Sequence, residues 1–145
     1  MPKDTITPAD EQQIMAAIKE AEMLTSGEIR VHIESNCEID VLDRATEVFA
    51  ELHMHQTEQR NGVLFYVALE DHQFAVLGDA GINASVPDHF WEDITAEVIS
   101  YFKKKKYAAG LARGIRMAGE QLQAHFPYNR HEDTNELSDD VSFGD

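Results

Sequence analysis

Apolar residues recur at intervals of three and four between residues 14 and 24, which is the spacing of one helix face. Thr7 immediately precedes Pro8, a pair typical of a helix N-cap followed by the first helical turn. The periodicity stops at Ser26 and Gly27, a sequence that favours the end of a helix. A first helix is therefore expected between these start and stop signals.

Three later segments have the patterns of strands. Residues 29–33 alternate between apolar and polar side chains, which predicts a strand with one apolar face. Residues 63–69, VLFYVAL, form a continuous apolar run, as expected of a central strand that is covered on both faces. The short sequence EDH that follows permits a hairpin turn into a third strand at residues 73–78.

The remaining apolar residues show helical spacing. They predict helices over residues 41–53, 90–102 and 107–125. The lysines at 103–106 close the second of these at the negative end of its dipole, an interpretation that we prefer to an anion site. The last helix contains Gly110, Gly114 and Gly119, each of which costs about 1 kcal/mol relative to alanine, so close packing is expected there.

The predicted element order is α-β-α-β-β-α-α. Helices before, between and after strands imply an α/β fold, a three-layer αβα sandwich around a small mixed sheet. The domain is expected to span residues 1–127. Residues 128–145 are acidic and poor in apolar side chains, so we predict a disordered tail there.

Composition narrows the classes of partner. The chain has 145 residues, a formal net charge of −15 and a single cysteine. Its charge opposes binding to nucleic acid or anionic membranes, and one cysteine cannot form an internal disulfide. No signal-peptide pattern and no apolar run of about 18 residues is present in the sequence. We expect a soluble cytoplasmic monomer with no nucleic-acid partner and no membrane span.

Five segments in a fixed order carry a family resemblance. They are TSGEIRVHI, RNGVLFYVA, AVLGDAGIN, YAAGLARGI and NELSDDVSFG, starting at residues 25, 60, 75, 107 and 135. Together they resemble the TPM domain family, small αβα domains of bacteria and plastids. The resemblance runs from about residue 8 to the end of the chain.

The resemblance implies a fold more directly than a function. Some relatives are regarded as acid phosphatases, others as photosystem-repair factors or receptor-associated modules, and divalent-metal binding is reported in the family. Many relatives have a signal peptide and a transmembrane helix beside the domain. This sequence departs from that pattern, which puts a lumenal or periplasmic location and a membrane partner in doubt.

Residues 34–43, ESNCEIDVLD, place oxygen-bearing side chains at alternate positions after the first strand. These are Glu34, Asn36, Glu38 and Asp40, and Asp43 follows three residues later. Carboxylate and amide oxygens are the ligands that calcium and magnesium prefer, so the loop is a candidate cation site. The alternative is a loop exposed to water; Asp40 or Asp43 also fits the cap of the next helix, a role that does not exclude cation binding.

Two specific sites are excluded at this loop. Counted from Glu34, the sixth position is Ile39 instead of glycine and the twelfth is Ala45 instead of glutamate, so it is not an EF-hand. Six residues separate Cys37 from Arg44, where a cysteine phosphatase loop requires five. No Asp-x-Asp-x-Thr segment for an aspartyl-phosphate mechanism is present in the sequence.

A second acidic group consists of Glu28, Asp79 and Asp88. If the first two strands are parallel, the hairpin brings Asp79 to the Glu28 end of the sheet, and residues 34–43 lie at the opposite edge. If the first strand is reversed, Asp79 meets residues 34–43 and one larger site forms. The sequence leaves both arrangements open, and Asp88 also fits a capping box with Ser85.

We expect the chain to bind a divalent cation, calcium in preference to magnesium, which orders surface loops and regulates a partner. The candidate ligands are Glu28, Glu34, Glu38, Asp40, Asp43, Asp79 and Asp88. The resemblance supports an alternative, a metal-dependent phosphomonoesterase, and whether the chain is an enzyme is left open. A further alternative is a non-catalytic module that binds an unidentified protein through the acidic tail.

Overall fold

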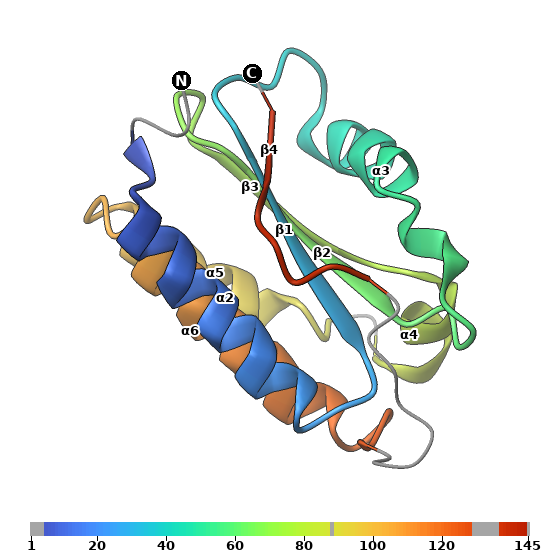
Figure 1. The fold of residues 1–145 in the computed structure, drawn as a ribbon. Coiled ribbons are helices and arrows are strands. Elements are labelled where there is room, and N and C mark those ends of the chain that lie inside the picture. The colour runs from blue at the N-terminus through green and yellow to red at the C-terminus, as the bar shows by residue number, and fades with distance from the viewer. Residues whose placement is uncertain (1–4, 88, 129–136, 145) are drawn as a thin grey trace.

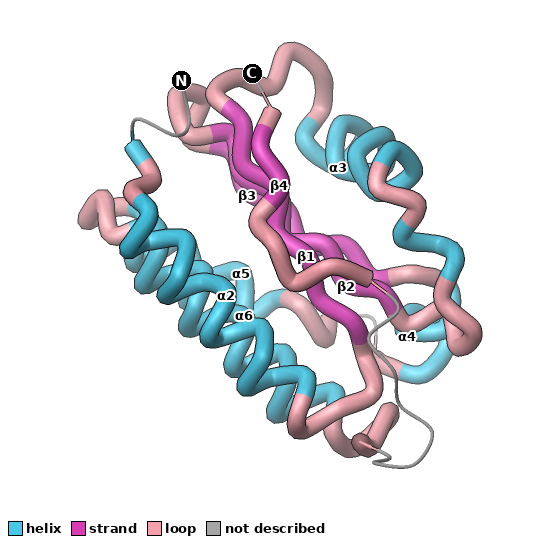
Figure 2. Tube along the Cα trace, in the orientation of Figure 1, coloured by secondary structure: helices cyan, strands magenta, loops and turns pink. Residues whose placement is uncertain are grey.

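A computed structural model describes residues 5–87, 89–128 and 137–144. The helices are α2 (Pro8–Glu22), α3 (Val41–Glu51), α4 (Ala80–Ser85), α5 (Glu92–Phe102) and α6 (Tyr107–Leu122), with a short 3-10 turn, η1 (Met54–Gln56). The strands are β1 (Glu28–Glu34), β2 (Gly62–Ala68), β3 (Gln73–Gly78) and β4 (Ser142–Phe143). A layer of α2, α5 and α6 covers one face of the sheet and α3 lies on the other (Figures 1 and 2). The predicted αβα sandwich is confirmed.

The sheet has the order β3-β2-β1-β4. β1 pairs in parallel with β2, Glu28 lying opposite Gly62, and β3 pairs antiparallel to β2. Asp79, directly after β3, donates its backbone N–H to the Gly62 carbonyl over 2.9 Å. Asp79 therefore lies at the Glu28 end of the sheet, and residues 34–43 begin at the opposite end, as in the first predicted arrangement.

Every residue of β2 is buried. One apolar cluster lies on each side of this strand. The larger cluster joins Ile29, Val31 and Ile33 of β1 to the helices α2, α5 and α6. The smaller one joins Leu64 and Tyr66 of β2 to α3 and η1. The continuous apolar run of β2 and the alternation of β1 thus have the physical reason expected of them: β2 is covered on both faces by apolar residues, β1 on one.

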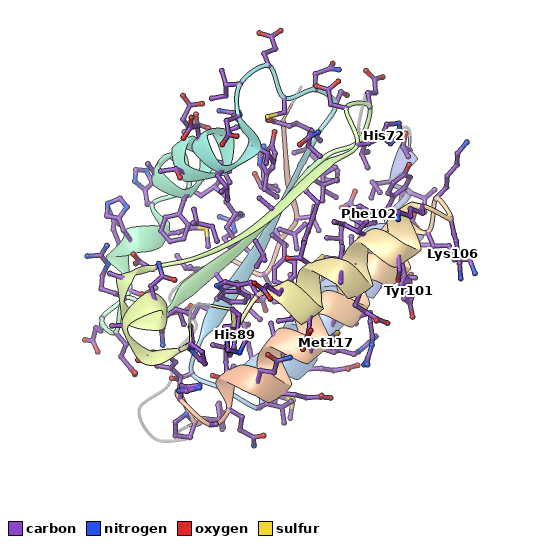
Figure 3. All side chains as sticks on the ribbon, turned by 180° about the vertical axis from the view of Figure 1, so that it is seen from behind. His72, His89, Tyr101, Phe102, Lys106 and Met117 are labelled. Carbon is purple, nitrogen blue, oxygen red and sulfur yellow. The ribbon has the colours of Figure 1, made fainter. Side chains whose placement is uncertain are left out.

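The glycines of α6 allow the helices of the larger layer to pack closely. A Cβ atom at Gly119 would lie 2.8 Å from Cβ of Ala21 in α2, and one at Gly110 would lie 2.7 Å from Cβ of Tyr101 in α5. Seen from behind, α5 and α6 run side by side over the sheet (Figure 3). The close packing predicted from the glycines is therefore present.

Three elements were not predicted: η1, α4 and β4. The segment after Asp79 forms the helix α4, whose first backbone N–H, that of Ala80, is accepted by the Asp79 side chain over 2.7 Å. Residues 137–144, which we call the C-terminal strap, lie along β1, and Ser142 and Phe143 form β4 there. The prediction of a disordered tail is corrected for the strap, because its backbone pairs with the free edge of β1. Residues 129–136 lie outside the described residues.

In the described part of the chain, no helix is long and apolar enough to cross a membrane.

Candidate functional site

The polar face of β1 is buried, although the alternating sequence predicted only that its other face is apolar. Its side chains are Glu28, Arg30, His32 and Glu34. Glu28, His32 and Glu34 are only 4%, 5% and 4% exposed. Because buried polar groups need hydrogen-bond partners, this face requires polar groups from other parts of the chain.

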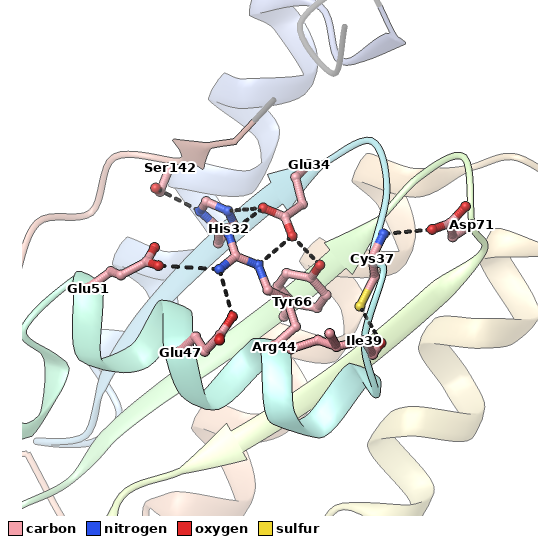
Figure 4. Close-up of polar contacts among 10 residues, drawn as sticks. All are labelled: His32, Glu34, Cys37, Ile39, Arg44, Glu47, Glu51, Tyr66, Asp71 and Ser142. Carbon is pink, nitrogen blue, oxygen red and sulfur yellow. Dashed lines mark hydrogen bonds and ion pairs between the residues drawn. The ribbon is translucent and has the colours of Figure 1, made fainter.

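At the carboxyl end of β1, Glu34 accepts hydrogen bonds from three sides (Figure 4). Arg44 of α3 binds both of its oxygens, over 2.9 and 3.0 Å, and Tyr66 donates its hydroxyl to the same carboxylate. Burial alone would raise the pKa of Glu34, but hydrogen bonds from Arg44, Tyr66 and His32 outweigh it and lower the pKa to about 2. Glu34 is therefore an ionised structural anion, and the prediction that it is a loop ligand finds no support here.

His32 connects this carboxylate to the strap. Its Nε2 lies 3.0 Å from Oε1 of Glu34 and its Nδ1 lies 2.9 Å from the Ser142 hydroxyl (Figure 4). The order hydroxyl, imidazole, carboxylate is the one that serine hydrolases use. Here Arg44 neutralises Glu34, and burial lowers the pKa of His32, so the ring is a weak base. We interpret these contacts as the means of seating β4 on β1.

Gly144 completes the seating of the strap. Its backbone N–H donates to the Ile33 carbonyl over 2.8 Å, and a Cβ atom at this position would lie 2.5 Å from Oε1 of Glu34. Only glycine fits without displacing that carboxylate. An open groove of about 760 Å³ lies outside this network, between α3 and β4, lined by His32, Glu34 and Arg44 among others.

The other predicted residues of the loop 34–43 do not converge. Asp40 caps α3 by accepting from the backbone N–H groups of Leu42 and Asp43 over 3.1 and 3.3 Å. Glu38 and Asp43 are exposed. The loop is held at its other end by Asp71, which accepts hydrogen bonds from the Asn36 side chain and the Cys37 backbone. The capping alternative accounts for Asp40 in this structure.

The carboxylate of Asp79 is likewise hydrogen-bonded to other residues of the chain. Arg60 donates to both of its oxygens, over 2.7 and 2.8 Å. Burial would raise the pKa of Asp79, but the hydrogen bond from Arg60 and that from the Ala80 backbone lower it below its ordinary value. Of its two predicted companions, Glu28 lies at the same end of the sheet and Asp88 lies outside the described residues. Ser85 was predicted to form a capping box with Asp88. In the structure its hydroxyl donates to the Gly81 carbonyl over 2.9 Å.

Glu28 instead faces the strap. Its Oε1 accepts the backbone N–H of Leu137 over 2.7 Å. Further along the strap, Arg30 donates to the Asp140 carbonyl over 3.3 Å. Every polar residue of β1 from Glu28 to Glu34 therefore lies against the strap, at Leu137, Asp140, Ser142 and Gly144 in turn.

An acidic pair lies where the strap passes the end of α2. Glu22, the last residue of α2, is half-buried, accepts the Ile29 backbone N–H over 3.3 Å, and is hydrogen-bonded to the side chain of Asp139. Burial, followed by the hydrogen bond and charge of Asp139, raises the pKa of Glu22 to about 9, and the charge of Glu28 adds to the effect. Glu22 therefore keeps its proton at neutral pH beside the side chain of Asp139.

Glu22 and Asp139 were not among the predicted site residues. Glu22 sits on the polar side of a helix, where charged residues are ordinarily solvated, and Asp139 was assigned to the disordered tail. The signal that could have found Asp139 was the segment NELSDDVSFG, which carries part of the family resemblance. Within the described ranges, no group of three or more histidine, cysteine, aspartate and glutamate side chains is arranged to hold a metal ion.

Comparison with known proteins identifies the family. The family model described as the TPM domain matches residues 2–121. The NMR structure of BA42 from the psychrophilic bacterium Bizionia argentinensis is 45% identical, with a TM-score of 0.90 over 96% of this chain and 95% of that one. No curated protein matches the chain.

Two more distant structures share the fold alone. The N-terminal domain of the cg2496 protein from Corynebacterium glutamicum is 13% identical, with a TM-score of 0.65 over 97% of this chain and 80% of that one. The N-terminal domain of a protein from P. gingivalis is 17% identical, with a TM-score of 0.70 over 87% of this chain and 82% of that one.

Proposed function

The chain belongs to the TPM domain family, and we propose that this domain binds a divalent cation, calcium in preference to magnesium, beside the C-terminal strap. The cation takes the place of the proton between Glu22 and Asp139, with Glu28 as a third carboxylate. The observation that carries the proposal is the hydrogen-bonded pair of Glu22 in α2 and Asp139 in the strap, whose surroundings include the charge of Glu28 in β1.

The local charge favours a cation at this place. Asp140 follows Asp139 in the strap, and the basic side chain of Arg30 lies beside them. Burial lowers the pKa of Arg30, whereas the charges of the two aspartates raise it. Carboxylates therefore outnumber the guanidinium there. A divalent ion would relieve this excess more completely than one shared proton, and the net charge of −15 for the whole chain points the same way.

The donor set fits a hard cation. Calcium takes six to eight oxygens in flexible geometry, whereas magnesium demands a nearly ideal octahedron. Carboxylates that come from a helix end, a strand and a strap suit the less demanding ion. Since the described side chains do not form a complete group of ligands, the proposal requires Glu28 to turn toward Glu22 and Asp139 when the ion binds. Backbone carbonyls and water would supply the remaining oxygens.

The consequence of binding is a firmer strap. An ion held jointly by Glu22 and Asp139 links α2 to the segment that covers the polar face of β1. Calcium would thereby order the strap and the surface beside it, and a partner that recognises this surface would respond to the ion. This retains the predicted role of a cation in ordering surface segments but moves it from the loop 34–43 to the strap.

Calorimetric titration of calcium into chelator-treated protein tests the proposal. We expect heat of binding in the unaltered protein, and its loss in Asp139→Asn. Asp43→Asn is the matched control, because Asp43 is an exposed aspartate of the originally predicted loop. Heat that persists in Asp139→Asn and disappears in Asp43→Asn would refute the proposed site, and no heat at millimolar calcium in the unaltered protein would refute binding altogether.

A further inference from the structure

An apolar pocket lies between the β2–β3 hairpin and the junction of α5 with α6. Its volume is about 270 Å³, and its lining includes His72, Phe74, Ile99, Phe102, Lys103 and Tyr107. In the view from behind, His72 at the hairpin and Phe102 at the end of α5 lie close to each other, with Lys106 in the loop beyond them (Figure 3). The pocket is slightly smaller than the ~300–1,000 Å³ of common ligand sites, so it suits a single chain or ring.

Aromatic side chains give this pocket a continuous wall. Phe74 packs against Phe102 with ring centroids 5.6 Å apart, and Phe102 packs against Tyr107 with centroids 5.3 Å apart. All three rings are partly exposed, and Ile99 at the rim is 37% exposed. An apolar ligand here would cover surface that water now reaches.

Only Lys103 lines the pocket, and Lys105 and Lys106 line a separate groove together with Asp10, although all four lysines at 103–106 are exposed. They make up a third of the chain's 12 lysines and arginines. Arginines 44, 60, 113 and 116 are each paired with a carboxylate. Within the described residues, by contrast, no carboxylate lies within ion-pair distance of these lysines. This is therefore a local basic surface on a strongly acidic protein.

The helix dipole favours lysines at this end of α5, but the carbonyls there do not need them as hydrogen-bond donors. The last carbonyls of α5 accept hydrogen bonds from the backbone of the loop itself, including Lys103 to Ile99 over 3.0 Å and Lys105 to Phe102 over 2.9 Å. The ammonium groups are not needed to satisfy them. Lys105 moreover has a φ of 59°, in the left-handed region where a helix end normally has glycine.

We propose that this pocket binds an amphiphilic anion, a small apolar chain that carries a carboxylate. The chain lies along Phe74, Phe102 and Tyr107, and the carboxylate pairs with Lys103, with the other lysines adding to the attraction. Charge complementarity selects the class of ligand, because the pocket wall is apolar and its charged rim is basic.

The test is a titration with decanoate below its micelle concentration, followed by NMR of the backbone amides. We expect shifts concentrated at Phe74, Phe102 and Lys103, and affinity about three- to tenfold higher than for neutral decanol. Lys103→Gln should remove that advantage, Lys103→Arg should keep it, and Lys19→Gln on α2 should leave it unchanged. Ile99→Asp, at an exposed position, should abolish binding of decanoate.

Three results would overturn the proposal. They are equal affinity for decanol and decanoate, equal or tighter binding of a decyl ammonium cation, and shifts that map to another surface. A circular dichroism melt of each variant confirms that it is folded, so that lost binding reports on the pocket.

Discussion

The two faces of β1 are both buried, but by different means. The apolar residues Ile29, Val31 and Ile33 pack into a cluster built from three helices. The polar residues on the other face meet a matching series of groups on the strap and on α3. Apolar burial is non-directional and accepts any well-shaped partner, whereas each polar group needs a particular donor or acceptor. The polar face therefore depends on specific residues, and those of the strap lie more than 100 positions away in the sequence.

The largest effect should come from the apolar face. Ile33→Ala removes a fully buried side chain and should lower the free energy of unfolding by about 2–5 kcal/mol, measured by urea denaturation. Leu42→Ala is the control, since Leu42 is 54% exposed and its truncation should change little. Equal losses for the two variants would contradict the assignment of the apolar face to the core.

On the polar face, Glu34→Gln should lower the free energy of unfolding at neutral pH by about 1.5–3 kcal/mol, measured by urea denaturation. The change weakens charged hydrogen bonds to Arg44 and leaves that guanidinium partly uncompensated. Glu47→Gln, which alters an exposed partner of the same arginine, should lower the free energy of unfolding far less.

The pH dependence of the stability is a second measurement of the role of Glu34. Because the folded pKa of Glu34 is about 2 and its ordinary value is 4.5, its contribution is present above pH 4.5 and is lost as pH falls toward 2. Acid denaturation should therefore be less steep in Glu34→Gln, and an unchanged acid limb would contradict this account.

Glu22→Gln should act in the opposite pH direction. The folded pKa of Glu22 is about 9, above its ordinary 4.5, so the stability that its proton provides is complete below pH 4.5 and declines as pH rises toward 9. Glutamine stays neutral over this range. The free energy of unfolding of the variant should therefore exceed that of the unaltered protein by about 1–2 kcal/mol between pH 5 and 9 in metal-free buffer, after allowance for solvent screening. Thermal melts across this range measure the difference, and parallel curves would show that the acidic pair does not hold a proton.

Ser142→Ala should have the smallest effect and lower the free energy of unfolding by about 0.5–1.5 kcal/mol. One hydrogen bond to His32 is lost, while the backbone pairing of β4 remains. Gly144→Ala is the informative companion, since its methyl group would press on the Glu34 carboxylate. Urea denaturation should rank Gly144→Ala as the more damaging of the two. The reverse order would mean that the strap is held by its side-chain contact and not by close backbone approach.

The fold could be predicted from local patterns, because each apolar stripe indicates its own buried face. The periodicities of α2 and α6 and the apolar run of β2 are complete within short segments. The strap could not be predicted in this way. Its apolar residues, Leu137, Val141 and Phe143, are interrupted by Asp139 and Asp140, and the segment is ordered by pairing with β1, more than 100 residues earlier in the chain. The predicted ligand set stays a prediction for a related reason: composition identifies oxygens but not which arginine or backbone group has already engaged them, as with Glu34 and Asp79.

Amide hydrogen exchange at Leu137 and Gly144 tests the central claim most directly. These backbone N–H groups donate to Glu28 and Ile33 and so report on whether the strap is seated. The account predicts that calcium slows their exchange in chelator-treated protein and has no such effect in Asp139→Asn, while amides of β2 remain unchanged in both. Exchange at Leu137 and Gly144 that is the same with and without calcium, in protein shown calorimetrically to bind the ion, would contradict a cation that fixes the strap.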